Sequence, residues 1–158
     1  MTAPPPATTA LEIRRARRDD VPAIVALYAD DFLGATRENL ADLAPYYAAF
    51  DVIAADANAE LMVAEEEGGR LVGTYQLNFI THLSHRGAKV AEVEAVRIAA
   101  GARGRGLGAE LMRAAMARAR AAGCAHLQLT SNKERTDAHR FYERLGFRRS
   151  HEGFKIYF

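Results

Sequence analysis

The chain has 158 residues, of which 49% are hydrophobic and 26% charged, with a formal net charge of +1. This length fits one domain with its own core, and the composition excludes low-complexity disorder. A single cysteine excludes a disulfide framework, and the near-neutral charge excludes the basic excess of a nucleic-acid-binding domain. No apolar run is long enough to span a membrane, and the first ten residues lack the pattern of a secretory signal. We therefore expect a soluble cytoplasmic protein without a membrane or nucleic-acid partner.

The hydrophobic pattern predicts strands and helices in alternation behind a short leader. The proline-rich residues 1–10 predict a disordered leader, and residues 11–158 predict one domain. Alternating apolar residues predict strands, and apolar stripes at helical spacing predict helices. In chain order, the predicted elements are a strand at 11–14, a helix capped by Asp19 or Asp20, a helix from Thr36 to about Phe50, strands at 61–64, 71–80 and 89–98, a helix at 106–122, a strand at 127–130, a helix at 136–145, and a final strand pair formed by Phe147 and 154–158.

The connections between these elements predict a mixed α/β sheet with helices on both faces. The strands at 61–64 and 71–80 flank a turn and predict an antiparallel hairpin. The strand, helix and strand between residues 89 and 130 predict two parallel strands joined by a right-handed crossover. We therefore expect a mostly antiparallel sheet that contains one parallel pair.

A glycine-rich turn between residues 99 and 109 joins a predicted strand to a predicted helix. Glycines at every second position free the backbone amides from neighbouring side chains, and the start of a helix leaves such amides unpaired at the positive end of its dipole. A pyrophosphate fits this arrangement, and arginine side chains would add forked donors. The candidate residues are Arg103, Gly104, Arg105, Gly106, Leu107, Gly108 and Ala109.

Four interpretations of this turn are possible. A Walker loop is excluded because no Gly-Lys-Ser/Thr is present. The dinucleotide fingerprint is formally matched by Gly104, Gly106 and Ala109, but it does not follow its strand directly, and no acidic residue ends the next strand. The turn could also be a plain tight turn whose glycines serve packing. The fourth interpretation is the pattern R-x-x-G-x-G, formed by Arg103, Gly106 and Gly108.

Two spaced motifs carry a family resemblance. The R-x-x-G-x-G turn and the element A-x-x-F-Y-x-x-x-G-F at 138–147 together resemble the acetyl-CoA-binding core of the GNAT N-acetyltransferases. More narrowly, residues 130–142 are similar to aminoalkylphosphonate N-acetyltransferases. The resemblance implies a GNAT-like single-domain sheet with a splayed central strand pair, and acetyl-CoA or coenzyme A as cosubstrate.

The resemblance also implies further coenzyme-binding residues. It places a backbone amide at Val96 where the oxyanion forms, and it implies that the main chain of Val96, Arg97 and Ile98 contacts the amide-rich pantetheine arm, much like an added strand. Many family members carry an asparagine at the position of Arg135, and Asn132 is a candidate substitute for that contact.

Two glutamates are candidates for the base that removes a proton from an amine. Glu92 and Glu94 lie on one face of the same predicted strand because side chains alternate along it. The resemblance places a catalytic glutamate at Glu92, and the residues leave open which of the two acts. Alternatively, one or both glutamates line the sheet surface or pair with Lys89 or Arg97.

Tyr142 is the candidate acid. Ala138, Phe141, Tyr142 and Leu145 share one helix face by their spacing. A core tyrosine with its hydroxyl at a polar rim would show the same pattern. Its place in the family element implies that it protonates the coenzyme thiolate.

The prediction that follows is an acetyl-CoA-dependent N-acetyltransferase that acts on a small primary amine by direct attack in a ternary complex. The alternatives are a protein or peptide N-acetyltransferase and a non-catalytic acyl-CoA sensor on the same fold. Arg86, Lys89 and Arg97 could receive an anionic substrate group, and His82 with His85 lacks the third ligand that a metal site needs. The resemblance also allows a homodimer, which these residues do not decide.

Overall fold

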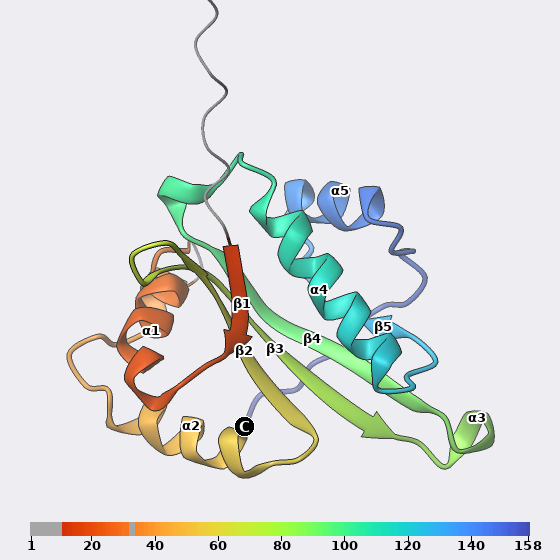
Figure 1. Cartoon of the computed structure of the whole chain (residues 1–158). Helices are drawn as coiled ribbons and strands as arrows, with labels where there is room; N and C mark the ends of the chain where they lie inside the picture. Colours follow the sequence, from red (N-terminus) through yellow and green to blue (C-terminus); the bar gives the residue numbers. More distant parts are fainter. Residues whose placement is uncertain (1–10, 32–33) are drawn as a thin grey trace, which may run out of the picture.

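The structure, a computed structural model, describes residues 11–31 and 34–158, so the leader expected at residues 1–10 lies outside the described residues. A five-stranded sheet forms its centre, in the order β1–β2–β3–β4–β5 (Figure 1). All neighbouring strands are antiparallel except β4 and β5, which are parallel, as the sequence predicted. The elements are β1 (Leu11–Arg15), η1 (Arg18–Asp20), α1 (Val21–Ala29), η2 (Gly34–Thr36), α2 (Ala44–Ala55), β2 (Ala59–Glu66), β3 (Arg70–Thr81), α3 (Ser84–Gly87), β4 (Lys89–Ile98), η3 (Ala100–Ala102), α4 (Leu107–Ala121), β5 (Leu127–Gln128) and α5 (Thr136–Arg144).

Two hydrophobic clusters lie on opposite faces of this sheet. Leu61 pairs with Gln76 and Met62 with Tyr75, and neighbouring residues of a strand point to opposite faces. Met62 and Tyr75 belong to the larger cluster, which also contains the buried side chains of α4. Leu61 belongs to the smaller cluster, with residues of α1 and α2. The helix α4 crosses one face of the sheet (Figure 1), and α1 and α2 pack on the other, so the prediction of helices on both faces is confirmed.

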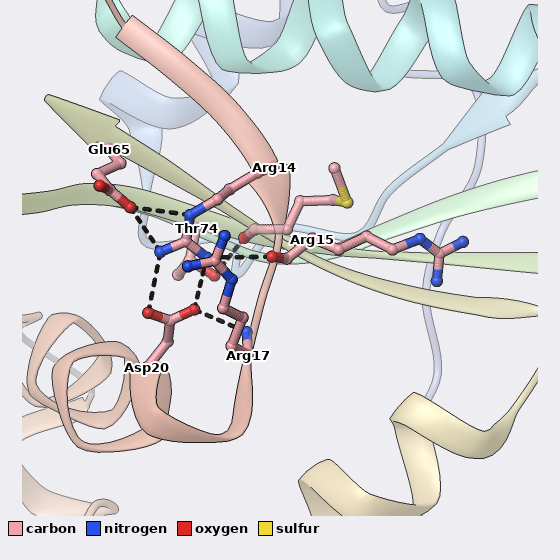
Figure 2. Close-up of polar contacts among 7 residues, drawn as sticks. Arg14, Arg15, Arg17, Asp20, Glu65 and Thr74 are labelled. Atoms are coloured by element: carbon pink, nitrogen blue, oxygen red, sulfur yellow. Dashed lines mark hydrogen bonds and ion pairs between the residues drawn. The ribbon is translucent and has the colours of Figure 1, made fainter. Parts of the chain in front are cut away.

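A half-buried ion cluster fastens the first strand to the start of α1 (Figure 2). The Arg14 guanidinium donates to Glu65 on β2 at 2.5 Å and to Asp20 at 2.7 Å. Asp20 also accepts the backbone amide of Arg17 at 2.7 Å. The hydrogen bond from Arg14 is the largest influence that lowers the pKa of Asp20. Chain segments far apart in the sequence are therefore held in one place by a single side chain.

The second helix begins later than the sequence predicted. Thr36 caps no helix that extends to Phe50, because it lies in the short η2, and α2 runs instead from Ala44 to Ala55. The Asp42 side chain accepts the amide of Ala44 at 3.1 Å, and Pro45 occupies the first turn of α2. A turn closed by a side chain and followed by proline is a strong helix start, and it overrides the earlier threonine.

The predicted final strand pair is wrong. Neither Phe147 nor residues 154–158 form a strand, and the described chain beyond α5 contains no helix or strand. A strand exists only through hydrogen bonds to a neighbouring strand. The Phe147 amide donates to the Tyr142 carbonyl at the end of α5 instead, and residues 154–158 form no backbone hydrogen bond with the described residues. β5 is also shorter than the predicted strand at 127–130. Among the described residues, no helix combines the length and hydrophobicity that crossing a membrane requires.

Candidate active site

The glycine-rich turn presents a row of free backbone amides. Gly104 and Gly106 have φ values of +75° and +79°, a left-handed conformation that other residues adopt at a cost. Glu110 is the first residue of α4 whose backbone amide donates a hydrogen bond to the turn. Its acceptor is the Gly106 carbonyl, at 3.2 Å. Across residues 11–31 and 34–158, the amides from Gly104 to Ala109 donate to no acceptor. Such amides at the N-terminus of a fifteen-residue helix can bind an anion.

The two arginines of the turn hold it in place. Arg103 donates to the Ile98 carbonyl at 3.1 Å and to the Asp30 carbonyl at 3.2 Å. Arg105 lies 2.7 Å from the Glu66 carboxylate, which is buried at the end of β2. Both side chains are therefore bound to protein groups, and their contact with a phosphate stays a prediction.

Gly108 faces Phe141 and Ile98 at the start of α4. A Cβ atom at this position would lie 3.4 Å from the Phe141 ring and 3.7 Å from Ile98. Leu107, on the same turn, packs against the larger cluster, and Ala109 beside it is partly buried. The sequence predicted amide roles for these residues, and the distances at Gly108 are ordinary van der Waals contacts, so a small side chain would fit there.

The central strands diverge beyond Glu92. β4 pairs with β5 only through Ala91 with Leu127 and Glu92 with Gln128. Within the described chain, no strand pairs with this side of β4 from Val93 to Ile98. The predicted splay is therefore present, and it leaves the main chain around Val96 and Ile98 without a strand partner on the β5 side, while β3 still pairs with Arg97 and Ile98 on the other side.

A bulge in β4 changes which side chains share a face. Thr74 pairs with Arg97 and Gln76 with Glu94, so two residues of β4 lie opposite one residue of β3. Ala95 has a φ of +52°, and one additional residue is what defines a β-bulge. Because Thr74 and Gln76 share a face, the bulge places Arg97 on the same face as Glu94. Regular alternation would have placed Arg97 on the opposite face.

Glu92 and Glu94 lie together on this face, as the sequence predicted. Glu92 accepts a hydrogen bond from the Gln128 amide at 2.8 Å. Burial is the main cause of the raised pKa of Glu94, and the neighbouring Glu92 charge raises it further, whereas Lys155 opposes both. A raised pKa brings the proton affinity of Glu94 toward that of a base working near neutral pH.

Tyr142 lies on α5 within electrostatic reach of Glu94. Its ring makes edge contacts with Phe141 and Phe147 at centroid distances of 5.2 and 5.8 Å. Burial raises the pKa of Tyr142, while the nearby positive charges of Arg97 and Arg135 lower it. The net effect keeps the hydroxyl protonated, which is the state that an acid requires.

Arg97 is a half-buried cation with few partners. One of its terminal nitrogens donates to the Val96 carbonyl at 2.8 Å, and another lies 3.5 Å from Asp31. Within the part of the chain that the structure describes, its Nε atom has no hydrogen-bond partner. Burial lowers the pKa of Arg97, and the charges of Arg135 and Arg37 lower it further, whereas Asp31 acts in the opposite direction. Asp31, which pairs with both Arg97 and Arg135, is the carboxylate that contacts the Arg97 guanidinium.

The side chains of Arg135 and Asn132 contact other groups of the protein in this structure. Arg135 forms a short ion pair with Asp31, which links the start of α5 to the end of α1. The Asn132 side chain accepts the amide of Glu134 at 2.9 Å and shapes the loop before α5. Their predicted coenzyme contacts stay predictions.

Sequence reasoning gave little weight to the residues at the end of α1. Asp30 accepts the amide of Ala100 at 3.1 Å beside the turn, and Asp31 reaches Arg97. The Tyr28 hydroxyl lies near Thr74 and Arg97, and burial raises its pKa. No local pattern marks these residues, because their partners lie far away along the chain. No group of three or more potential metal ligands occurs among the described residues.

Comparisons with known proteins agree with this geometry. The acetyltransferase (GNAT) family matches residues 21–147. An aminoalkylphosphonate N-acetyltransferase of Salmonella typhimurium is 30% identical over 140 residues, which cover 89% of this chain and 86% of that protein. A Bacillus halodurans structure described as a transcriptional regulator is 43% identical, has a TM-score of 0.90, and covers 94% of this chain and 100% of its own. A Clostridium acetobutylicum structure, described as a predicted acetyltransferase with acetyl-CoA, shares the fold at 16% identity, with a TM-score of 0.73 and coverage of 94% and 96%.

Proposed function

Because the chain belongs to the acetyltransferase (GNAT) family, whose enzymes use acetyl-CoA, we propose that it N-acetylates a small primary amine by direct attack in a ternary complex. One observation carries this proposal. Successive residues at the end of α1 contact the turn with free amides, through Asp30, and the polar face of β4, through Asp31. The end of α1 therefore links the turn to the face of β4 that carries Glu94, which supports the proposal that donor and acceptor meet there.

The chain offers two main-chain surfaces to the donor. The free amides from Gly104 to Ala109 would bind the diphosphate of coenzyme A, with Arg103 and Arg105 holding the turn in shape. The side of β4 that no described strand pairs with beyond Glu92, at Val96 and Ile98, would pair with the amide groups of the pantetheine arm. The acetyl group would then lie in the gap between β4 and β5.

Three groups near this gap supply the chemistry. An alkyl amine with a pKa near ~10.4 must lose a proton before it attacks. We assign this step to Glu94, with Glu92 beside it raising its proton affinity. The backbone amide of Val96 would stabilise the oxyanion, and one such donor is worth about 10²–10³ in rate. The protonated Tyr142 hydroxyl would give its proton to the departing thiolate.

The acceptor in this proposal carries an acidic group. Arg97 has an unpartnered buried nitrogen, and Arg135 and Arg37 add positive charge beside it. A buried cation without enough partners is costly, and a phosphonate or carboxylate would supply the missing acceptors. The Salmonella relative acts, by its name, on aminoalkylphosphonates, which supports the same class of acceptor.

A thiol-release assay with acetyl-CoA tests the proposal. We expect turnover with small amines that carry a phosphonate or carboxylate, and lower kcat/KM with uncharged amines of equal length. Tyr142→Phe should reduce kcat, and His151→Ala, an exposed change in the C-terminal segment, serves as its control. Undiminished turnover in Tyr142→Phe would remove the acid assignment and leave the donor site in place.

Two rival functions give different results in the same assay. The Bacillus halodurans relative described as a transcriptional regulator favours a sensor that binds an acyl-CoA without catalysis. A sensor would be stabilised by coenzyme A in a thermal-shift experiment and would release no thiol with any amine. A protein acetyltransferase would acetylate a lysine-containing peptide faster than any small amine.

A further inference from the structure

An apolar pocket of about 120 Å³ lies between the helices α1 and α2 and the sheet. Its walls include Val25 and Tyr28 of α1, Phe50 of α2, Leu61 of β2 and Gln76 of β3. Leu61 pairs with Gln76 across the two strands, so both side chains point to the face of the sheet that α1 and α2 cover. The sheet therefore forms the floor of the pocket, and the two helices form its sides.

The pocket adjoins the residues assigned to the acceptor. Gln76 pairs with Glu94 of β4, so the proposed base lies on the same face as the pocket, one strand away. Tyr28, in another wall, lies within electrostatic reach of Arg97. A second hollow, of about 200 Å³, is lined in part by Arg15 and contains neither of these two wall residues. The smaller pocket is therefore the one that borders both the base and the half-buried cation.

The polar side chains in the pocket wall already have partners. The Tyr46 hydroxyl donates to Glu38 at 2.9 Å, and the Gln76 amide donates to Asn78 at 2.9 Å. The Tyr28 hydroxyl forms a hydrogen bond with a threonine of β3. A water molecule in the pocket would find few further groups to bond, and this favours an apolar group in its place.

The volume of the pocket indicates the size of that apolar group. An apolar protein cavity of about 150 Å³ binds benzene, which has six carbon atoms. In proportion, a volume of about 120 Å³ suits a group of about four or five carbon atoms. A branched aliphatic chain such as isobutyl has this size.

The base and the cation are close enough to bind one small molecule. Thr74 pairs with Arg97 and Gln76 with Glu94, and residues two apart in a strand are separated by about 7 Å. A compound whose amine approaches Glu94 can therefore direct an acidic group to Arg97 and a third group into the pocket. An amine, an acidic group and a side chain on one carbon atom form such a compound.

We propose that the pocket binds an apolar side chain of the acceptor, which is an α-amino acid or a 1-aminoalkylphosphonate with a branched side chain of about four carbons. This inference rests on the proposed acetyl transfer and narrows its acceptor. Each of the three groups on the reacting carbon has its own site, so only one enantiomer places all three correctly.

A series of acceptors tests the proposal by thiol release with acetyl-CoA. The compounds carry a hydrogen, methyl, isobutyl or indolylmethyl group beside the amine, with the acidic group unchanged. We expect kcat/KM to rise about fourfold for each buried CH₂ up to isobutyl, and to fall at indolylmethyl, which exceeds the pocket. One enantiomer of the isobutyl compound should react about tenfold faster than the other.

The same series separates the inference from the function on which it rests. Turnover of the unsubstituted compound upholds the acetyl transfer. If kcat/KM then stays flat or falls from hydrogen to isobutyl, or if both enantiomers react equally, the inference is overturned alone. Absence of turnover with every compound would overturn the proposed function together with the inference.

Ala49→Leu supplies an independent measurement. Ala49 lines the pocket from an exposed position on α2, so a larger side chain there fills part of the pocket without disturbing the core. The loss in kcat/KM should be about tenfold greater for the isobutyl compound than for the unsubstituted one. Ala48→Leu is the matched control, because Ala48 is also exposed on α2 and lies outside the lining that the described residues form. Equal losses for both acceptors in Ala49→Leu would overturn the inference.

Discussion

Two arginines of equal burial have opposite surroundings in this molecule. The side chains of Arg14 and Arg97 are 14 and 17% exposed. Arg14 donates to two carboxylates through all three of its nitrogens (Figure 2), and these bonds raise its pKa. Arg97 shares one carboxylate with Arg135 and has a nitrogen without a partner among the described residues, and burial lowers its pKa. The comparison teaches that burial alone does not distinguish an arginine that stabilises the fold from one that is available to bind a ligand. The number of hydrogen-bond acceptors around the guanidinium does distinguish them.

The largest expected effect concerns the region around Arg97. Glu94→Gln removes the proposed base and should lower kcat about 10²–10⁴-fold, because proton transfer by a placed group contributes that much. Steady-state thiol release measures the change. Glu92→Gln is the matched control on the same strand face and should cost less. A larger loss in Glu92→Gln would transfer the base role to Glu92.

The next effect concerns the region around Arg14. Arg14→Met leaves Asp20 and Glu65 without their cation, and the free energy of unfolding should fall by about 3 kcal/mol. Urea denaturation measures this change. Arg17→Met, a nearby change at an exposed side chain, should have little effect. A negligible loss in Arg14→Met would contradict the structural role assigned to the cluster.

Arg97→Met should show the reverse behaviour. Removing a poorly satisfied buried charge should change the free energy of unfolding by less than about 1 kcal/mol. The KM for an acidic amine should rise about 10–100-fold, because a hydrogen bond to a charged group is worth about 1.5–3 kcal/mol. The KM for an uncharged amine should not change, and Arg86→Met should leave both values unaltered. An equal rise for both amines would show that Arg97 does not recognise an acidic group.

The smallest effect is a pH dependence of stability. The pKa of Asp20 is lowered in the folded state, so its contribution is present above its unfolded pKa of ~3.9 and is lost as the pH falls through the folded value. Asp20→Asn should therefore destabilise the protein by roughly 1 kcal/mol near neutral pH, and less as the pH falls below about 4. Denaturation curves at several pH values measure the difference. A difference that stays constant with pH would contradict the pairing with Arg14.

The features that depend on local sequence could be predicted. The hairpin, the parallel crossover and the glycine turn each follow from residues close together in the chain, and the structure contains all three. The final strand pair could not be predicted from residues 154–158 alone, because pairing depends on a partner and not on composition. The contact between Asp31 and Arg135 joins residues 104 positions apart, and no local pattern reports it.

The bulge in β4 is visible in the sequence as a break in the regular alternation of apolar residues. Ala91 and Val93 are buried before Ala95, and Val96 and Ile98 pack against the same cluster after it. The residues of β4 that pack in the larger cluster therefore change from odd to even positions at Ala95. A change of phase in a period-two pattern indicates an inserted residue, and it could have placed Arg97 beside Glu94 from the sequence alone.

One surplus residue in β4 has a wider consequence for the architecture. A bulged strand bends and twists more strongly than a regular one, and β4 loses its pairing with β5 a few positions before Ala95. The width of the opening between β4 and β5 then depends on the number of residues in β4 as well as on their types. Shortening β4 by one position would straighten it and narrow that opening, even with every charged side chain still facing the same way.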